Sequence, residues 1–417
     1  MASTTSTHVD LWEEPGIAKT TMNVQDTLEK THLNDFAWWF WFVVPLYPFS
    51  KRQTIRKEVI KDTVWTFDQV QGIFYVVVPI RMTVVKLEQG LLIYAPVAPT
   101  PECIRLVNEL VAEHGDVKYI ILPTISGIEH KVFVGPFARR FPNAQVFVVP
   151  NQWSFPLNLP LSWLGFPRDR THVLPQDSSQ APFADECDYA ILGAIELGPG
   201  RFSEVAFFHK KSQTLLVTDS VVSVPEEPPA IVQLDPYPLL FHAKDSATDA
   251  IADNQANRRK GWQRTALFAL YFRPSVLDVV GWGEVLRKAI IAPDRSRKNY
   301  FGLFPFKWTQ NWQRSFDALC GNGRLFVAPI LQTLILNRAP KETIDWANKV
   351  ASWNFEWIIP CHFDAPIKAR SQQFRQAFDF LERHDTSPLP KEDFQLLKDI
   401  DAGLSKLGIV PPPQHKS

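Results

Sequence analysis

Four side chains with metal-ligating chemistry each follow an apolar segment of the chain. They are Glu129, His130, Asp219 and His362. Ligands gather at the carboxyl ends of strands in α/β sheets, so we expect side chains at these places to meet. Two imidazoles and two carboxylates form a ligand set suited to Zn²⁺, Fe or Mn. A metal held by them would lower the pKa of a bound water and polarise a substrate oxygen.

The segments that precede these residues have the composition of buried strands. Residues 117–122, 215–218 and 357–359 are short apolar runs bounded by polar or turn residues. A helix is expected to begin at Pro101, with Thr100 as its N-cap. Further strands are expected at 74–78, 82–87, 91–94, 145–149, 189–192 and 204–208, and helices at 342–353 and 367–383. Strand, loop, helix and strand in this order predict an α/β fold.

Composition excludes several classes of function. Lys plus Arg and Asp plus Glu are both 44 in 417 residues, and a chain without net charge does not favour nucleic acid as a partner. The four cysteines are scattered without a CxxC pair, which indicates neither a thiolate zinc knot nor a disulfide framework. A reducing compartment is the simpler expectation. The first residues lack the basic and apolar regions of a secretory signal.

Changes in composition along the chain predict three parts. Residues 1–78 are expected to form an N-terminal extension and residues 79–385 the main α/β domain. Within that domain, residues from about 225 to 325 are Pro-rich, then charged, then aromatic, and are interpreted as an insertion of helices and loops. Residues 386–417 are expected to form a polar C-terminal tail.

An aromatic block at residues 36–49 has two interpretations. It is too short to span a membrane and contains helix-breaking prolines. The favoured interpretation is a strap packed across the domain's own core. The alternative is peripheral contact with an anionic membrane through residues 36–57, because Trp prefers the headgroup level and basic residues follow. Those residues are Lys51, Arg52, Arg56 and Lys57.

The order of these segments resembles the metallo-β-lactamase superfamily. The family's first motif, His-x-His-x-Asp-His after a strand, resembles Ile125-Ser-Gly-Ile-Glu-His130. Its mid-chain Gly-His loop resembles residues 198–205, its bridging-aspartate segment resembles residues 215–219, and its last motif resembles Pro360-Cys-His362. The resemblance covers about 80–222 and 328–383 and implies a four-layer αββα sandwich, here with a helical insertion and an aromatic N-terminal extension.

The departures from the family pattern concern the first of its two metal sites. The three histidines of that site are matched here by Ile125, Gly127 and Gly200, none of which ligates a metal through its side chain. The second site is matched by Glu129, His130, Asp219 and His362, all of which retain ligand chemistry. The resemblance therefore implies one divalent metal, with zinc favoured over iron or manganese.

A narrower resemblance is to an uncharacterised cyanobacterial and plastid family within that superfamily. Residues 129–139, 153–160 and 218–225 carry it. This resemblance implies a compartment rather than a reaction. The expected location is the cytoplasm of a cyanobacterial-type cell, with peripheral placement on a membrane surface as an extension of that expectation.

Two hypotheses of function follow from different classes. In the first, the protein is a mononuclear metallohydrolase that cleaves an ester, thioester or phosphate-like bond of a small molecule, and Asp219 and His362 are its catalytic residues. Asp219 would also accept a proton from the attacking water. In the second, the fold is a non-catalytic scaffold without a metal, associated with a membrane or a protein complex.

Neighbouring residues have alternative interpretations. Cys361 is interpreted as a small buried hydrophobe in preference to an extra ligand. Asp364 either orients His362 or caps a helix, and the sequence favours neither. His209 is expected to be exposed in a hairpin turn, and His242 is expected to be packed within the insertion rather than to reach the site.

Overall fold

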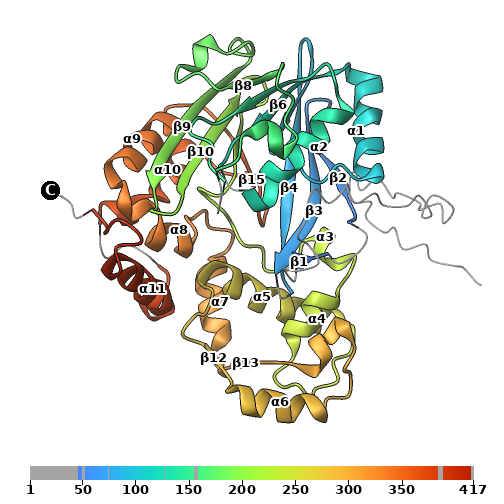
Figure 1. The fold of residues 1–417 in the computed structure, drawn as a ribbon, viewed down its shortest axis with the longest axis vertical. Helices are drawn as coiled ribbons and strands as arrows, with labels where there is room; N and C mark the ends of the chain where they lie inside the picture. The colour runs from blue at the N-terminus through green and yellow to red at the C-terminus, as the bar shows by residue number, and fades with distance from the viewer. Residues whose placement is uncertain are drawn as a thin grey trace, which may run out of the picture.

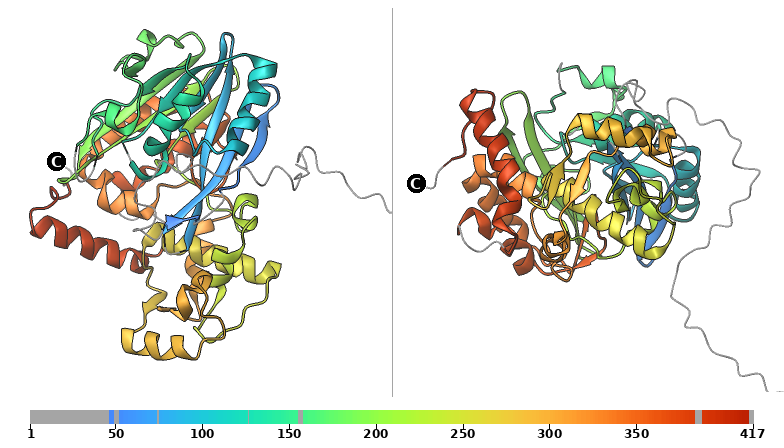
Figure 2. Two further views of the ribbon diagram at one scale, coloured as in Figure 1. Left: turned by 45° about the vertical axis from the view of Figure 1, so that its right-hand side comes forward. Right: turned by 90° about the horizontal axis from the view of Figure 1, so that it is seen from below.

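Two β-sheets packed face to face form the centre of the protein (Figure 1). The computed structural model describes residues 46–48, 52–73, 75–125, 127–154, 158–383 and 388–414. Helices cover the outer face of each sheet, and a further group of helices extends from one end of the two sheets (Figure 2).

The first sheet has eight strands and carries the N-terminal half of the site. Its strands are β1 (Leu46–Tyr47), β2 (Ile55–Ile60), β3 (Val64–Ile73), β4 (Val76–Leu87), β5 (Gly90–Tyr94), β6 (Val117–Leu122), β7 (Gln145–Val148) and β8 (Thr171–Val173). They lie in the order β1-β3-β4-β5-β6-β7-β8, with β2 paired to β3. Strands β3 to β5 are antiparallel and β5 to β8 are parallel, so β5, β6 and β7 all end at one edge.

The second sheet has five strands and carries the C-terminal half of the site. Its strands are β9 (Cys187–Glu196), β10 (Arg201–His209), β11 (Thr214–Val217), β14 (Trp357–Pro360) and β15 (Ile367–Lys368). They lie in the order β15-β14-β11-β10-β9. Strands β11 and β14 are parallel neighbours, although about 140 residues separate them along the chain. Asp219 and His362 therefore leave the sheet at the same edge.

Three apolar clusters hold the layers together. Strand β5 is buried on both faces because its residues alternate, with Leu92 and Tyr94 facing the second sheet and Leu91 and Ile93 facing the helices. Helices α1 (Pro101–His114) and α2 (Val132–Arg140) cover the outer face of the first sheet. Helices α9 (Pro340–Ala351) and α10 (Ser371–Gln376) lie over the second sheet. The fold is the expected four-layer αββα sandwich.

Helix α1 forms as its sequence indicates. The Thr100 hydroxyl accepts a hydrogen bond from the Cys103 amide at 3.2 Å, and Pro101 occupies the first helical position. The stripe that it buries consists of Cys103, Leu106, Val107 and Leu110. This helix sets the angle of the chain between β5 and β6, whose ends form one side of the site.

The segment between β11 and β14 contains helices and short strands at one end of the sandwich (Figure 1). Up to residue 325 its α-helices and strands are α3 (Ala230–Gln233), α4 (Tyr237–Ala243), α5 (Gln255–Tyr271), β12 (Leu277–Val279), α6 (Trp282–Ile290), β13 (Phe306–Trp308) and α7 (Trp312–Cys320). Helix α5 packs against β4, and the ring of Trp262 lies 5.9 Å from that of Phe363, centroid to centroid. The insertion therefore supports the turn that follows β14.

The element boundaries differ from the expected ones at both ends of the domain. Residues 74–78 are not a separate strand, because β4 runs unbroken from Val76 to Leu87 and pairs along its length with β3. The first sheet thus extends well before residue 79. The expected helix at 367–383 is interrupted, since residues 367 and 368 pair with β14 as strand β15 before α10 begins.

The expected polar tail contains a docked helix, α11 (Gln395–Lys406), beside α8 (Pro329–Leu334). Leu397 is fully buried, and Asp401 forms an ion pair with the buried Arg338. Composition did not indicate this helix because only a narrow part of its surface is apolar.

Most of the aromatic block at 36–49 and Lys51 lie outside the described residues. Arg52, which follows that block, is buried, donates to the Val70 carbonyl at 2.8 Å and lies over the Phe133 ring. Among the described ranges, no helix is long and apolar enough to cross a bilayer.

Candidate metal centre

Three side chains converge where the edges of the two sheets meet. One ligand atom from each of Glu129, His130 and His362 lies within 4.8 Å of the others. The Nε2 atom of His362 is 3.0 Å from Glu129 Oε2 and 3.2 Å from Asp219 Oδ1. The four residues that the sequence singled out are therefore neighbours, and the group whose ligand atoms surround one point is Glu129, His130 and His362.

Main-chain carbonyls fix the orientation of both imidazoles. His130 Nδ1 is 3.1 Å from the Pro96 oxygen, and His362 Nδ1 is 2.9 Å from the Pro79 oxygen. A carbonyl only accepts hydrogen bonds, so each Nδ1 carries the proton and donates it. Each Nε2 is thereby left to face the space between Glu129, His130 and His362. Histidine ligands of metals are commonly oriented in this way, with the second nitrogen held by a backbone carbonyl.

The Nε2 atom of His130 has a distinctive environment. It is buried and has no hydrogen-bond partner. A buried polar nitrogen without a partner is costly, by about 1–3 kcal/mol. Glu129 and His362 form a hydrogen bond with each other, whereas the Nε2 atom of His130 still lacks a partner in the space between the three side chains. The donor set therefore fits a divalent metal ion, with two imidazole nitrogens and one carboxylate facing it.

A π-helical turn, Gly127–Lys131, places Glu129 and His130 at the end of β6, immediately before α2. The wider turn lets adjacent residues present side chains to the same centre, and such turns are frequent at functional sites. Lys131 then turns away from the centre and donates from Nζ to the Trp153 carbonyl at 2.8 Å. The sequence pattern did not indicate this turn.

Glu204 of β10 holds the loop that carries Asp219. Its buried carboxylate accepts hydrogen bonds from the amides of Thr218, Asp219 and Ser220 at 2.8, 3.1 and 2.8 Å, and from the Ser220 hydroxyl at 2.8 Å. Burial raises the pKa of Glu204 to about 7, with the nearby Asp219 charge adding to the effect. The sequence identified Glu204 only as the start of a strand.

Arg81 of β4 holds the turn that carries His362. Its guanidinium donates to the carbonyls of Pro360 at 2.7 Å and Phe363 at 3.1 Å, and pairs with Asp68 at 2.6 Å. Phe363 has a φ of 57°, which costs energy in a bulky residue and requires such support. Because Pro79 also lies on β4, one strand fixes both the turn and the ring of His362.

The charges of the cluster are strongly coupled. Burial alone would raise the pKa of Glu129, but the charge and hydrogen bond of His362 outweigh it and lower that pKa. Burial would lower the pKa of His362, but Glu129 and Asp219 raise it well above its ordinary value. Burial lowers the pKa of His130, so its Nε2 is a free base. A cation at the shared point would replace the His362 proton as the partner of both carboxylates.

The residues expected to replace the first metal site have other surroundings. Ile125 packs in the apolar cluster between the two sheets. A Cβ on Gly200 would meet the Trp153 ring at 3.1 Å, so this position lies against an indole. The surroundings of position 127 lie outside the described part of the chain.

Other expectations can now be compared with the structure. Cys361 is buried in the cluster between the sheets, as expected for a small hydrophobe. Asp364 does not orient the His362 ring, because the Pro79 carbonyl occupies Nδ1. The expected exposure of His209 is wrong: it is fully buried, and its Nδ1 contacts the Ser212 hydroxyl at 2.7 Å. The hairpin folds back over the ring. His242 is packed against Phe241 and Phe306 in the insertion, as expected.

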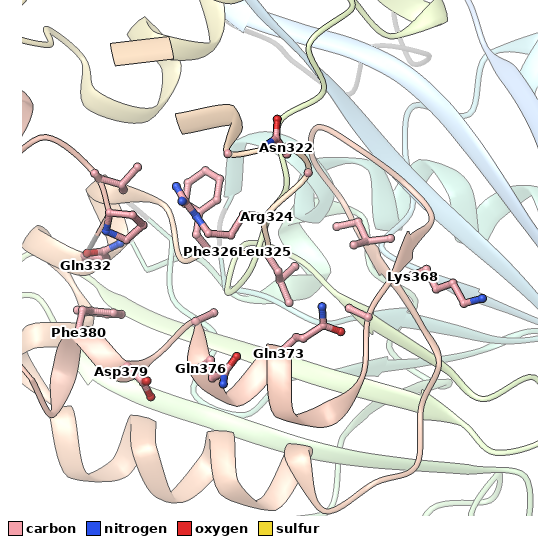
Figure 3. Close-up of a pocket in the computed structure, with 17 residues that line it drawn as sticks. Asn322, Arg324, Leu325, Phe326, Gln332, Lys368, Gln373, Gln376, Asp379 and Phe380 are labelled. Carbon is pink, nitrogen blue, oxygen red and sulfur yellow. The ribbon is translucent and has the colours of Figure 1, made fainter. Parts of the chain in front are cut away.

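A cavity of about 580 Å³ lies elsewhere, beside α10 (Figure 3). Arg324, Gln332, Lys368, Gln373 and Gln376 are among the residues that line it, and none of the four candidate ligands does. Its lining provides side-chain amides, the cations Arg324 and Lys368 and one carboxylate, Asp379, but no imidazole, so it lacks a set of several ligands for a divalent cation. The histidine cluster is therefore the candidate centre, although it does not belong to this cavity.

A family model matches more than half of this chain. The model described as Domain of unknown function (DUF4336) matches residues 61–380. The chain belongs to this family. The matched part of this DUF4336 protein includes both sheets from β3 onward, the insertion and all four candidate residues. No curated protein matches the sequence.

Solved structures similar to this DUF4336 protein include metallo-β-lactamases and a flavo di-iron protein from Thermotoga maritima. DIM-1 metallo-β-lactamase exposed to ceftazidime is 9% identical, with 79% of this chain and 99% of that chain covered and a TM-score of 0.37. The metallo-β-lactamase from Pontibacter korlensis is 10% identical, with 78% of this chain and 99% of that chain covered and a TM-score of 0.35. The metallo-β-lactamase from Hirschia baltica is 7% identical, with 82% of this chain and 100% of that chain covered and a TM-score of 0.36. At such low scores, the layers of the chain itself establish the fold.

Proposed function

We propose that this DUF4336 protein binds one divalent metal ion through Glu129, His130 and His362, with Asp219 beside it, and hydrolyses an ester, thioester or phosphate-like bond. The observation that supports the proposal most is the buried, unpartnered Nε2 of His130, which faces the same point as the carboxylate of Glu129. Zinc is favoured over iron and manganese because imidazole nitrogens contribute two of the donors.

A divalent ion in such a donor set supplies a nucleophilic water near neutral pH and polarises the oxygen of the scissile group. The side chains of Glu129 and Asp219 are 30% and 24% exposed, whereas that of His362 is 9% exposed. Substrate would therefore approach from the side of the carboxylates. In this proposal Asp219 would accept a proton from the attacking water, and the hydrogen bond from its amide to Glu204 supports a fixed position for its loop.

A single metal is part of the proposal. Ile125 contributes only to the packing between the sheets, and Gly200 lies against Trp153. These positions therefore offer no side-chain ligand on the other side of the centre. One metal is chemically sufficient, because the same ion can supply both the nucleophile and the Lewis acid.

Hydrolysis of model substrates tests the proposal. We expect the zinc-loaded protein to cleave at least one of p-nitrophenyl acetate, a thioester and bis-p-nitrophenyl phosphate, with a rate that falls more than about 100-fold in His362→Ala. His172→Ala, at an exposed histidine on β8, is the matched control and retains the rate. Equal rates in wild type and His362→Ala, with metal bound, would count against catalysis at this centre.

A non-catalytic scaffold is the second candidate, and one observation favours it. Glu129, Asp219 and His362 satisfy one another through contacts of 3.0 and 3.2 Å, so part of the cluster is stable as an ion pair without a metal. The loss of first-site ligands is consistent with this function as well. Absence of bound metal under every loading condition would favour it over the hydrolase.

We further propose a cyanobacterial or plastid setting for the protein, on the resemblance of residues 129–139, 153–160 and 218–225 to that family. Membrane contact through residues 36–57 receives less support from the described part of the segment. Arg52 is buried, and Arg56 pairs with Glu109 at 2.9 Å, so Lys57 is the basic side chain left exposed there among residues 52–57.

A further inference from the structure

Helix α6 of the insertion presents an apolar stripe to solvent. Trp282, Leu286 and Ile290 follow one another at intervals of four residues and are 71%, 56% and 70% exposed. Residues four apart lie on the same face of a helix, so the three side chains form one continuous surface. The neighbouring face, with Val285 and Ala289, is buried against the insertion. The stripe is therefore not needed to anchor the helix.

Residues next to α6 enlarge this surface. Ile291 and Phe301 are exposed large apolar side chains, and Val279 of β12 is a third. Phe301 belongs to the turn that packs beside α6, and its φ of 56° is unusual for a bulky residue. We define the α6 face as Val279, Trp282, Leu286, Ile290, Ile291 and Phe301. Contiguous apolar surface of this kind marks an interaction site.

The position of the α6 face suits contact with a large, flat partner. Helix α6 lies at the extremity of the insertion that is farthest from the two sheets (Figures 1 and 2). In Figure 1 and in the left view of Figure 2, no other described element extends past it at that end. A helix that lies across such an end can rest its whole length on a planar surface.

Charge selects the kind of partner. Residues 272–307 contain seven Lys or Arg and three Asp or Glu, in a chain whose total charges balance. Arg287, Arg295 and Lys307 are exposed. The acid Glu284 is already neutralised by Lys288 at 2.7 Å. The α6 face is thus an apolar strip with a basic surround.

We propose that the α6 face docks this protein onto an anionic lipid bilayer. An amphipathic helix with Trp and aliphatic residues on one side and cations around it lies in the plane of the interface, with its apolar side among the acyl chains. The indole of Trp282 is suited to the headgroup level, and the flanking cations are attracted to anionic headgroups. This contact is independent of the metal centre and does not require hydrolysis.

Vesicle flotation tests the proposal with the full-length protein. The probes are phosphatidylcholine vesicles with and without about 30% phosphatidylglycerol. We expect wild type to float with the anionic vesicles, and binding to fall about tenfold without the anionic lipid or at about 0.5 M salt. The variant with Trp282→Ala, Leu286→Ala and Ile290→Ala should lose about tenfold or more of that binding.

A matched control separates the α6 face from general surface hydrophobicity. Trp163, Val173 and Leu407 are exposed apolar residues outside the insertion, at 71%, 59% and 74%. Their triple alanine variant removes a similar apolar area and should float like wild type. Both triple variants alter exposed side chains, so circular dichroism and the melting temperature should stay close to those of wild type.

Several results would overturn the proposal. One is flotation of the α6 variant equal to that of wild type. A second is loss of flotation only in a variant with Trp38→Ala, Trp39→Ala and Trp41→Ala, which would assign membrane contact to the aromatic block instead. A third is failure of wild type to bind vesicles while sedimentation velocity shows a dimer that the α6 variant abolishes. The α6 face would then join two copies of the chain.

Discussion

The imidazole rings of His130 and His362 lie 6.4 Å apart, centroid to centroid, and a proline carbonyl holds the Nδ1 atom of each. One ring comes from the turn after β6 and the other from the turn after β14, so each sheet contributes one. With both Nδ1 protons directed to the main chain, the two Nε2 atoms face Glu129 and the space beside it. This arrangement supports the proposal that the two rings are held ready for a metal ion.

Replacement of Glu204 by glutamine should destabilise the protein and weaken metal binding. The amide has one oxygen where the carboxylate has two, so at least one amide donor of residues 218–220 loses its acceptor. We expect the free energy of unfolding in urea to fall by about 2 kcal/mol. The Asp219 loop should also shift, which would lower metal affinity about 10–100-fold by titration calorimetry.

Glu196→Gln is the matched control for Glu204, because Glu196 is exposed and pairs with Arg201 at the surface. Its effect on the free energy of unfolding should stay within about 0.5 kcal/mol. If Glu204→Gln behaved like this control in both measurements, the positioning of the Asp219 loop by Glu204 would be disproved.

Replacement of Arg81 by lysine should loosen the His362 turn. A single ammonium cannot reproduce the fork that serves Pro360, Phe363 and Asp68 together. We expect a loss of about 2 kcal/mol in the free energy of unfolding and weaker metal binding. Arg105→Lys, in an exposed pair with Glu109, should change stability by less than about 0.5 kcal/mol. If Arg81→Lys bound metal with wild-type affinity, the turn that carries His362 would not depend on the Arg81 guanidinium.

The buried His209 should make the fold less stable in mild acid. Burial lowers its pKa from 6.5 to about 4, so between these values the unfolded chain binds a proton that the folded chain does not. Stability is therefore lost as pH falls from 6.5 toward 4, by about 2 kcal/mol at about pH 5. In His209→Gln this part of the dependence should vanish. Urea unfolding at about pH 7 and pH 5 measures it, and equal pH dependence in both proteins would refute the assignment.

The fold was predictable where local pattern and tertiary structure agree. Alternation or short apolar runs indicated β5, β6 and β11, and the Thr100-Pro101 pair marked the start of α1. Strands β2 and β3 were not predicted, because they mix charged or polar residues with apolar ones, and they are stabilised by the pairing of β2 with β3 and of β3 with β4. Pairing of that kind has no strong local signature.

For the candidate site, the sequence indicated the candidate ligands but not the groups that hold them in place. Histidines and acids at strand ends have a recognisable type and place, and the structure brings Glu129, His130 and His362 together. Their role as ligands stays a prediction. Pro79 and Pro96 act through backbone oxygens, which any residue possesses, so the sequence could not mark them. Arg81 serves a turn 279 residues away, a relationship that exists only in three dimensions.

Metal content per chain tests the central claim most directly. The protein is purified without chelators, loaded with Zn²⁺, desalted and measured by elemental mass spectrometry alongside His130→Ala, His362→Ala and the exposed-histidine control His172→Ala. We expect about one zinc per chain in wild type and in the control, and almost none in the other two variants. Absence of metal from wild type, or equal content in all four proteins, would contradict it.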